Sequence, residues 1–249
     1  MRNWLSIIFL VCLISCDTEN APDCFQRTGD MVRKEVTVPN FTRILVNPNV
    51  EMVLKQGEES SVVIETGENL INEVTARVEG DRLILENTND CNLVRDFNQT
   101  KIFVTAPEIT EIRSATQFDI SSEGVLTYPS LNLVSEDFNE DTGYTTGTFH
   151  LTMNNQNLRI IGNNIASYFI TGEVVNLNVR LFSGTGRFEG TDLISQNVQV
   201  FHRGSNKIIV NPQQSLKGEI RSTGDVIAVN KPDIIEVEEF FSGRLIFLQ

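Results

Sequence analysis

The chain has 249 residues, of which 40% are hydrophobic and 21% are charged. This length holds one large β domain or two smaller domains, and the composition is too close to the globular average for a disordered chain. The formal net charge of −13 argues against nucleic acid as a partner, because phosphate backbones select basic surfaces.

The first fifteen residues have the pattern of a signal peptide. Arg2 supplies positive charge, and the apolar run at 5–14 that follows is too short to span a bilayer. The run ends in Leu13-Ile14-Ser15-Cys16, which looks like a lipobox, so we expect cleavage before Cys16 and lipid attachment to it. Residues 16–33 are then a lipid-anchored tether that holds the protein on a membrane. An ordinary signal peptide with a chance cysteine is the alternative.

The cysteine count predicts one disulfide. Cys12 leaves with the signal peptide and Cys16 takes the lipid, so Cys24 and Cys91 remain as an even pair in an oxidising compartment. Closing a loop of that length stabilises the fold by roughly 4 kcal/mol in the loop-entropy model. A metal site or a catalytic thiol is the competing interpretation, and no histidine lies near either cysteine in the sequence to support it.

Alternating strand patterns dominate from residue 34 onward, so residues 34–249 are expected to form one all-β domain. Breakers such as Asn47-Pro48-Asn49 separate the apolar segments, and no segment keeps a helical period. Strands are expected in the first half at 35–38, 43–46, 50–54, 61–66, 73–78, 82–85 and 101–105.

The second half repeats. Glycines fall at 124, 143, 162, 184, 204, 224 and 243, with gaps of 19 to 22 residues. Asn157-Leu158-Arg159-Ile160 aligns with Asn178-Val179-Arg180-Leu181 at a step of 21, and Asn197-Val198-Gln199-Val200 follows. A period near 20 residues with Gly and Asn turns predicts a β-solenoid whose coils stack about 4.8 Å apart, after a strand-rich N-terminal part of the same domain. The 24 asparagines suit ladders of stacked amides in the turns, and the 15 phenylalanines suit an aromatic core. A β-sandwich is the alternative.

An ordered series of motifs resembles the GIN-head domain family, whose members are named as auto-transporter adhesins. The motifs are Asn40-Phe41-Thr42-Arg43-Ile44, the segments 50–58, 68–71, 79–85 and 104–112, and the turns Ser183-Gly184-Thr185-Gly186 and Ser222-Thr223-Gly224-Asp225. The resemblance covers about 34–249 and implies a right-handed β-helix-like fold in an envelope lipoprotein of Bacteroidetes-type bacteria. It brings no catalytic residues. The family's Ser-Gly repeats are eroded around 114–164, where an insertion near 136–147 interrupts the coils.

Catalytic patterns are sparse. His150 and His202 are the only histidines, and neither lies in a nucleophile motif, so a structural or surface role is expected for both. Two histidines are also too few for a zinc site. Paired carboxylates for sugar cleavage are the remaining option, because β-helix enzymes act on polysaccharides. The candidates are Glu236, Glu238 and Glu239 with Arg221 and Asp225. Charge that keeps a strand edge soluble explains Glu236 and Glu238 equally well.

One acidic loop carries a calcium-like spacing. Asp137, Asn139 and Asp141 offer three oxygen ligands, but the glycine falls one place late and Thr148 stands where a bidentate Glu would complete the loop. A solvated acidic loop is the alternative. No cofactor or resident metal is expected.

Binding is the function that the pattern favours. A solenoid presents a long ladder of outward side chains that suits an extended ligand. Tyr128, Tyr144 and Tyr168 could stack on sugar rings, although aromatic residues at strand positions usually belong to the core. We therefore expect a non-enzymatic binding or adhesion module of the bacterial cell envelope, at the outer membrane or cell surface, for glycans or another surface component. A structural envelope protein and a β-helix polysaccharide lyase or hydrolase are the alternatives. An exposed terminal coil could pair edge to edge, which leaves a homo-oligomer open.

Overall fold

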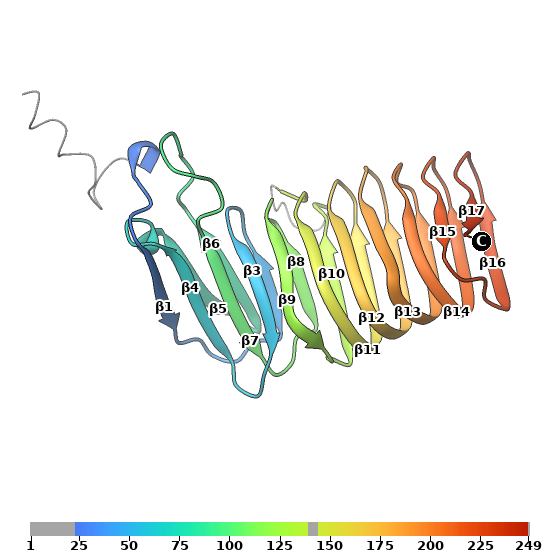
Figure 1. The fold of residues 1–249 in the computed structure, drawn as a ribbon, viewed down its shortest axis with the longest axis horizontal. Coiled ribbons are helices and arrows are strands. Elements are labelled where there is room, and N and C mark those ends of the chain that lie inside the picture. The colour runs from blue at the N-terminus through green and yellow to red at the C-terminus, as the bar shows by residue number, and fades with distance from the viewer. Residues whose placement is uncertain (1–22, 139–143, 249) are drawn as a thin grey trace, which may run out of the picture.

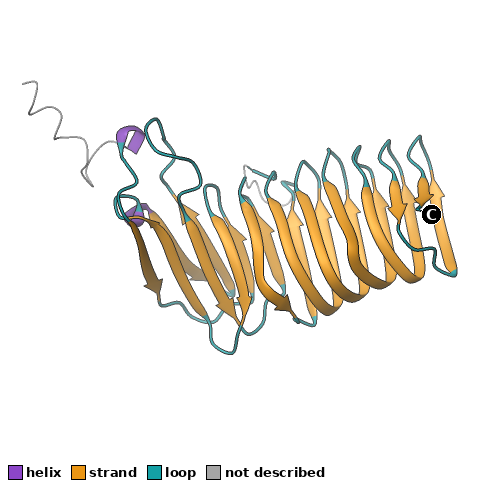
Figure 2. Ribbon diagram, in the orientation of Figure 1, coloured by secondary structure: helices purple, strands orange, loops and turns teal. Residues whose placement is uncertain are grey.

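The structure, a computed structural model, describes residues 23–138 and 144–248. These residues form an all-β fold with two short 3₁₀ helices, which confirms the expected class (Figure 2). The strands lie across a long axis that runs from the N-terminal to the C-terminal end of the chain (Figure 1).

The elements in chain order are η1 (Asp23–Phe25), β1 (Met31–Val36), β2 (Arg43–Val46), β3 (Glu51–Gln56), β4 (Ser61–Gly67), η2 (Ile71–Glu73), β5 (Val74–Glu79), β6 (Arg82–Asn87), β7 (Lys101–Ala106), β8 (Glu111–Ser114), β9 (Asp119–Leu126), β10 (Ser130–Ser135), β11 (Thr148–Gly162), β12 (Ser167–Leu181), β13 (Arg187–His202), β14 (Ile208–Ile220), β15 (Val226–Ala228), β16 (Ile234–Glu239) and β17 (Leu245–Phe247). β1 begins at Met31, so the paired chain starts three residues before the expected boundary at residue 34.

The strands stack into two faces. The first face contains, in spatial order, β1, β4, β7, β3, β9, the N-terminal halves of β11 to β14, β15 and β17. The second face contains β5, β6, β2, β8, β10, the C-terminal halves of β11 to β14, and β16. Each long strand therefore crosses from one face to the other, and a rung is one strand segment on each face. Apolar side chains from both faces meet between them as one core.

From β10 to β14, neighbouring strands on the second face pair in parallel, each with the next in the chain, and β14 then pairs with β16. Leu158 pairs with Leu177, Leu177 with Val198, and Val198 with Leu216, at steps of 18 to 21 residues. These side chains are buried and form one column of the core. A second column on the first face stacks Phe149 on Tyr168, with ring centroids 5.0 Å apart. The expected period near 20 residues is therefore the step between rungs.

The repeat alignment within this period was wrong by two residues. Asn157–Ile160 pairs with Asn176–Val179, and not with Asn178–Leu181. A shift of two residues keeps every side chain on the same side of the strand, so the in–out pattern alone cannot distinguish the two registers.

The N-terminal rungs do not follow chain order. β2 lies between β6 and β8, and β3 lies between β7 and β9, in each case with parallel pairing. The rung formed by β2 and β3 therefore lies between the rung of β6 and β7 and the rung of β8 and β9, both of which come later in the chain. β1, β4 and β5 close this end with antiparallel pairs.

Four of the seven repeating glycines stack in the turns between rungs. Ser205 donates its backbone N–H to the carbonyl of Gly184 (2.9 Å), and Gly224 donates to that of Gly204 (3.2 Å). A Cβ on Gly243 would lie 2.3 Å from the carbonyl oxygen of Gly224, so only glycine allows this spacing. The other three differ: Gly162 ends β11, residue 124 lies inside β9, and residue 143 is outside the described residues. The connection 136–147 is longer than the later turns, which agrees with the expected insertion.

Candidate functional site: an amide-lined groove

A groove of about 680 Å³ runs along the second face across β10 to β14. It crosses five successive strands in the direction of the long axis. Two rows of outward side chains line it. Between the two rows, the buried side chains of Leu158, Leu177, Val198 and Leu216 point into the core. The first row is Ser130, Asn157, Asn176, Asn197 and Ser215, and the second row is Asn132, Arg159, Asn178, Gln199 and Lys217.

The first row is a continuous hydrogen-bonded ladder. Asn157 Nδ2 donates to Ser130 Oγ (3.0 Å), Asn176 Nδ2 to Asn157 Oδ1 (3.0 Å), and Asn197 Nδ2 to Asn176 Oδ1 (3.3 Å). Ser215 Oγ closes it by donating to Asn197 Oδ1 (2.9 Å). Each amide nitrogen has two N–H groups, and the ladder uses one of them. The row therefore offers further donors at the spacing of the strands, about 4.8 Å.

The sequence builds this row by alternation. Leu158, Leu177 and Val198 point into the core, so the residue before each must point outward. The in-register stacking then brings identical side chains together, and amides satisfy one another in such a stack. The expected asparagine ladder is thus confirmed, although it lies on strands rather than in turns.

The second row is more varied. Asn178 Nδ2 donates to Gln199 Oε1 (3.1 Å), and Lys217 forms an ion pair with Glu236 (3.0 Å). Arg159 is exposed and has no hydrogen bond or ion pair to any residue in the two described ranges. It is therefore a cation that faces the groove without a carboxylate beside it.

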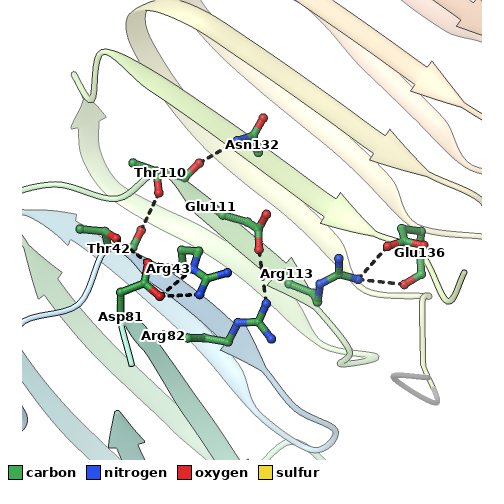
Figure 3. A network of polar contacts seen from close by, with 9 residues as sticks. All are labelled: Thr42, Arg43, Asp81, Arg82, Thr110, Glu111, Arg113, Asn132 and Glu136. Atoms are coloured by element: carbon green, nitrogen blue, oxygen red, sulfur yellow. Dashed lines mark hydrogen bonds and ion pairs between the residues drawn. The ribbon is translucent and has the colours of Figure 1, made fainter. Parts of the chain in front are cut away.

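A network of ion pairs borders the groove on its N-terminal side (Figure 3). In it, Arg43 pairs with Asp81, and Arg82 with Glu111 (3.9 Å). The Arg43 partner holds the pKa of the Asp81 carboxyl below its usual range, mainly through their hydrogen bonds.

Figure 3 shows three further contacts. Arg113 Nη1 donates to Glu136 Oε1 (2.9 Å), and both side chains are buried. Thr110 Oγ1 donates to the carbonyl of Thr42 (3.1 Å), and Asn132 Nδ2 donates to the carbonyl of Thr110 (3.1 Å). Asn132 thus joins this network to the groove. The arginines of the network, Arg43, Arg82 and Arg113, each have a carboxylate partner.

An aromatic cluster lies beside the groove. The Arg180 guanidinium lies 5.4 Å from the ring centroid of Phe182 and 5.6 Å from that of Phe201. Phe138 meets Phe182 edge to face at 6.3 Å. A smaller hollow of about 150 Å³ contains Arg180, Phe201, Asn178 and Gln199. Since the two hollows share the last two residues, the polar rows continue directly into the aromatic cluster.

The groove can hold an extended polar molecule. Its rows offer repeated donors and acceptors and the Arg159 guanidinium, and the Arg180 guanidinium and aromatic faces lie beside them. Such a surface favours binding along a chain, because the same contacts recur at each rung.

The structure joins Cys24 and Cys91 in a disulfide with a Cα–Cα distance of 4.5 Å, as expected. It fastens η1 to the connection between β6 and β7. Cys16 lies outside the described residues. Within residues 23–138 and 144–248, no helix is long and apolar enough to cross a membrane.

The calcium candidate is only partly described. Asn139 and Asp141 lie outside the described residues. Asp137 is exposed, and its Oδ1 accepts a hydrogen bond from Asn163 Nδ2. Among the described residues, no group of three His, Cys, Asp or Glu side chains could hold a metal ion.

The candidate catalytic carboxylates do not converge on the groove. Glu236 and Glu238 are exposed on β16, which pairs only with β14 among the described strands. Charge on such an edge opposes pairing with another chain. Glu239 Oε1 accepts a hydrogen bond from the backbone N–H of Leu245 (2.8 Å).

The other two candidates have contacts of their own. Arg221 pairs with Glu219 and stacks 4.1 Å from the ring centroid of Phe240. Asp225 Oδ1 accepts a hydrogen bond from the backbone N–H of Arg244 (2.8 Å). Arg244 contacts both Glu239 (3.6 Å) and Asp225, whereas Glu236 pairs with Lys217 and Arg221 with Glu219, so the five residues do not form one cluster.

Of the two histidines, one lies on the surface and one is buried, as the expected surface or structural roles require. His150 is exposed on the first face and stacks on Phe169, with ring centroids 5.0 Å apart. His202 is buried, its Nε2 lies 2.7 Å from the carbonyl oxygen of Asn206, and burial lowers its pKa.

The tyrosines divide into two groups. Tyr128 and Tyr168 are fully buried and donate hydrogen bonds to the carbonyls of Ala106 (3.0 Å) and Ile161 (3.2 Å). Burial raises the pKa of both phenols. Only Tyr144 is exposed, so two of the three tyrosines cannot stack on a ligand.

A family model matches residues 40–232, and its description is "Putative auto-transporter adhesin, head GIN domain". The chain belongs to this family. The family predicted from the motifs between residues 40 and 112 is therefore confirmed. A search of curated proteins finds no match to this GIN-head chain.

Solved structures share the fold. A "putative adhesin" from Bacteroides fragilis has a TM-score of 0.79 at 18% identity, covering 89% of this chain and 99% of its own. A "putative lipid binding protein" from Parabacteroides distasonis has a TM-score of 0.63 at 13% identity, with 90% and 99% coverage. A "putative adhesin" from Parabacteroides merdae has a TM-score of 0.58 at 15% identity, with 90% and 98% coverage. At these identities the likeness shows the fold alone.

Proposed function

We propose that this GIN-head protein is a lipid-anchored binding module of the bacterial cell envelope that holds an extended polysaccharide in its amide-lined groove. The observation that carries the proposal is the ladder from Ser130 to Ser215. A polysaccharide presents hydroxyl groups at regular intervals, and a ladder of amides meets such groups with donors and acceptors in the same order. Phe201 and Phe182 supply aromatic faces beside it.

The names of similar proteins support binding over catalysis. The family is described as adhesins, and the structural neighbours are named as adhesins or as a lipid-binding protein. We favour a glycan over a lipid because the outward side chains of both rows are mainly amides and hydroxyls. A binding experiment with polysaccharides tests the glycan directly.

Two further parts complete the proposal. Cys16 carries the lipid, because it follows the apolar run at the position expected for acylation. The coils wind as a right-handed β-helix, because connections between parallel strands of one sheet are almost always right-handed.

The binding test uses the chain from residue 17, which keeps every helix and strand that the structure describes. Retention in gels that contain neutral or acidic polysaccharides, together with released sugar, is measured for the same samples. We expect saturable retention without product. The Asn176→Ala variant breaks the ladder and weakens retention, while Asn211→Ala removes an amide outside the groove and leaves retention unchanged. Equal retention by both variants would exclude the groove, and product release would replace binding by catalysis.

The anchor is tested separately in cells. The full chain is expected in the membrane fraction and labelled by a fatty-acid probe, whereas Cys16→Ser loses both the label and the membrane association. A Cys12→Ser variant is the control, because that residue leaves with the signal peptide. Unchanged labelling of Cys16→Ser refutes the anchor and leaves the groove untouched.

A further inference from the structure

We infer that the polysaccharide held in the groove is acidic, and that Arg159 and Arg180 bind its carboxylate or sulfate groups. The inference rests on the proposed function and names the class of its ligand. Nothing in the family description assigns a charge to a ligand.

One part of the second face, from β10 to β14, is basic in an acidic protein. The chain carries a formal net charge of −13. The outward positions from β10 to β14 on the second face nevertheless hold three cations and one carboxylate. They are Arg159, Arg180, Lys217 and Glu219.

The first face has the opposite balance. Over the same rungs its exposed and half-buried positions hold Glu173, Glu189 and Asp192 against Arg187. The excess of cations on this part of the second face, which ends at the carboxylates of β16, points to an anionic ligand there.

Two of these cations are not neutralised by the protein. Lys217 pairs with Glu236, and Glu219 pairs with Arg221. No ion pair joins Arg159 or Arg180 to a residue of the described ranges, and Arg180 instead stacks on two aromatic rings. An arginine held by aromatic stacking keeps its planar donor fork directed and charged.

The positions of the two guanidinium groups suit a repeating anion. Ile161 pairs with Arg180, so Arg159 lies one strand away and two residues along the strand from Arg180. This places their Cα atoms about 8 Å apart by strand geometry. Each guanidinium can meet a carboxylate or sulfate with two parallel hydrogen bonds. The amide ladder beside Arg159 then receives the neutral hydroxyl groups of the same chain.

The experiment compares three polysaccharides of similar length by titration calorimetry with the chain from residue 17. Polygalacturonate carries carboxylates, dextran sulfate carries sulfates, and dextran is neutral. We expect tighter binding of an acidic polymer than of dextran, with an affinity that falls as salt rises. Binding of only one acidic polymer identifies which anion is read.

The Arg159→Gln variant is expected to lose roughly tenfold or more in affinity for the acidic polymer, because one charge-assisted contact is removed, and its preference for that polymer over dextran is expected to shrink. Arg187→Gln removes the same charge from the first face and is the matched control, with no expected change. Dextran binding as tight as acidic binding, with Arg159→Gln unaffected, overturns the inference and leaves the proposed function standing. If none of the three polymers binds, the proposed function and the inference fall together.

Discussion

Replacing Gly184 by alanine should destabilise the protein far more than the same change at Gly124. Both glycines have positive φ, +79° and +85°. An alanine there is strained by about 1–2 kcal/mol. At Gly124 the new Cβ meets nothing within 4 Å, whereas at Gly184 it lies 2.2 Å from the carbonyl oxygen of Asn164. That oxygen accepts the N–H of Thr185 (2.8 Å), and Gly184 itself accepts from Ser205 (2.9 Å).

The difference follows from those two hydrogen bonds. Moving the turn weakens both, at about 1 kcal/mol each. We therefore expect about 3 kcal/mol for Gly184→Ala and about 1 kcal/mol for Gly124→Ala. For a chain of this size, these losses lower Tm by roughly 6–12 °C and roughly 2–4 °C. Thermal unfolding of the chain from residue 17 measures both. Equal decreases in Tm for the two variants would show that the stacked turns at 184, 204, 224 and 243 do not require close approach between rungs.

Three further predictions concern the disulfide and the buried charges. Cys91→Ser should lower the free energy of unfolding by roughly 4 kcal/mol, because the bond closes a loop of sequence separation 67, and reduction of the unmodified protein should match it in urea titrations. Arg113→Met removes the buried cation that pairs with the Glu136 carboxylate and should cost about 3–5 kcal/mol. Adding Glu136→Gln should recover most of this loss, and a double variant no more stable than the single one would contradict the buried-pair assignment. His202 has a pKa lowered by burial, so its stabilising effect is complete above the unfolded pKa near 6.5 and is lost as the pH falls through the lower folded value. His202→Gln should flatten the loss of stability between pH 7.5 and 5, measured by urea titration at each pH.

The inward rows of this fold could be predicted from the sequence because packing repeats them. Leu158, Leu177 and Val198 occupy equivalent positions at each rung, and the glycines at 184, 204 and 224 recur where the turns approach closely. Both features depend on neighbours one rung away, so the chain must repeat them at a near-constant step. The period near 20 residues was visible for this reason.

The order of the N-terminal rungs could not be predicted in the same way. β2 pairs with β6 and β8, which lie about 40 and 70 residues later in the chain. Each of these strands carries the same alternation, so the pattern fits several neighbours equally well. The groove was missed for a related reason. The sequence alignment placed Asn157 with Asn178, and only the correct register brings the amides of Asn157, Asn176 and Asn197 into one row.

The outward side chains of such a fold determine which ligand its surface can bind. The backbone hydrogen bonds between rungs form whatever the outward side chains are, and the inward side chains are fixed by packing. An outward residue can therefore change without loss of the fold, so a row of like residues there needs a reason of its own. The amide ladder could be explained by stability alone, since it satisfies itself from Ser130 to Ser215. The exposed Arg159 cannot, because it stabilises no described neighbour and adds a charge beside a self-satisfied row. An anion in the groove would give this cation an ion pair that the described residues do not supply, so the Arg159→Gln variant distinguishes a ligand site from a structural ladder.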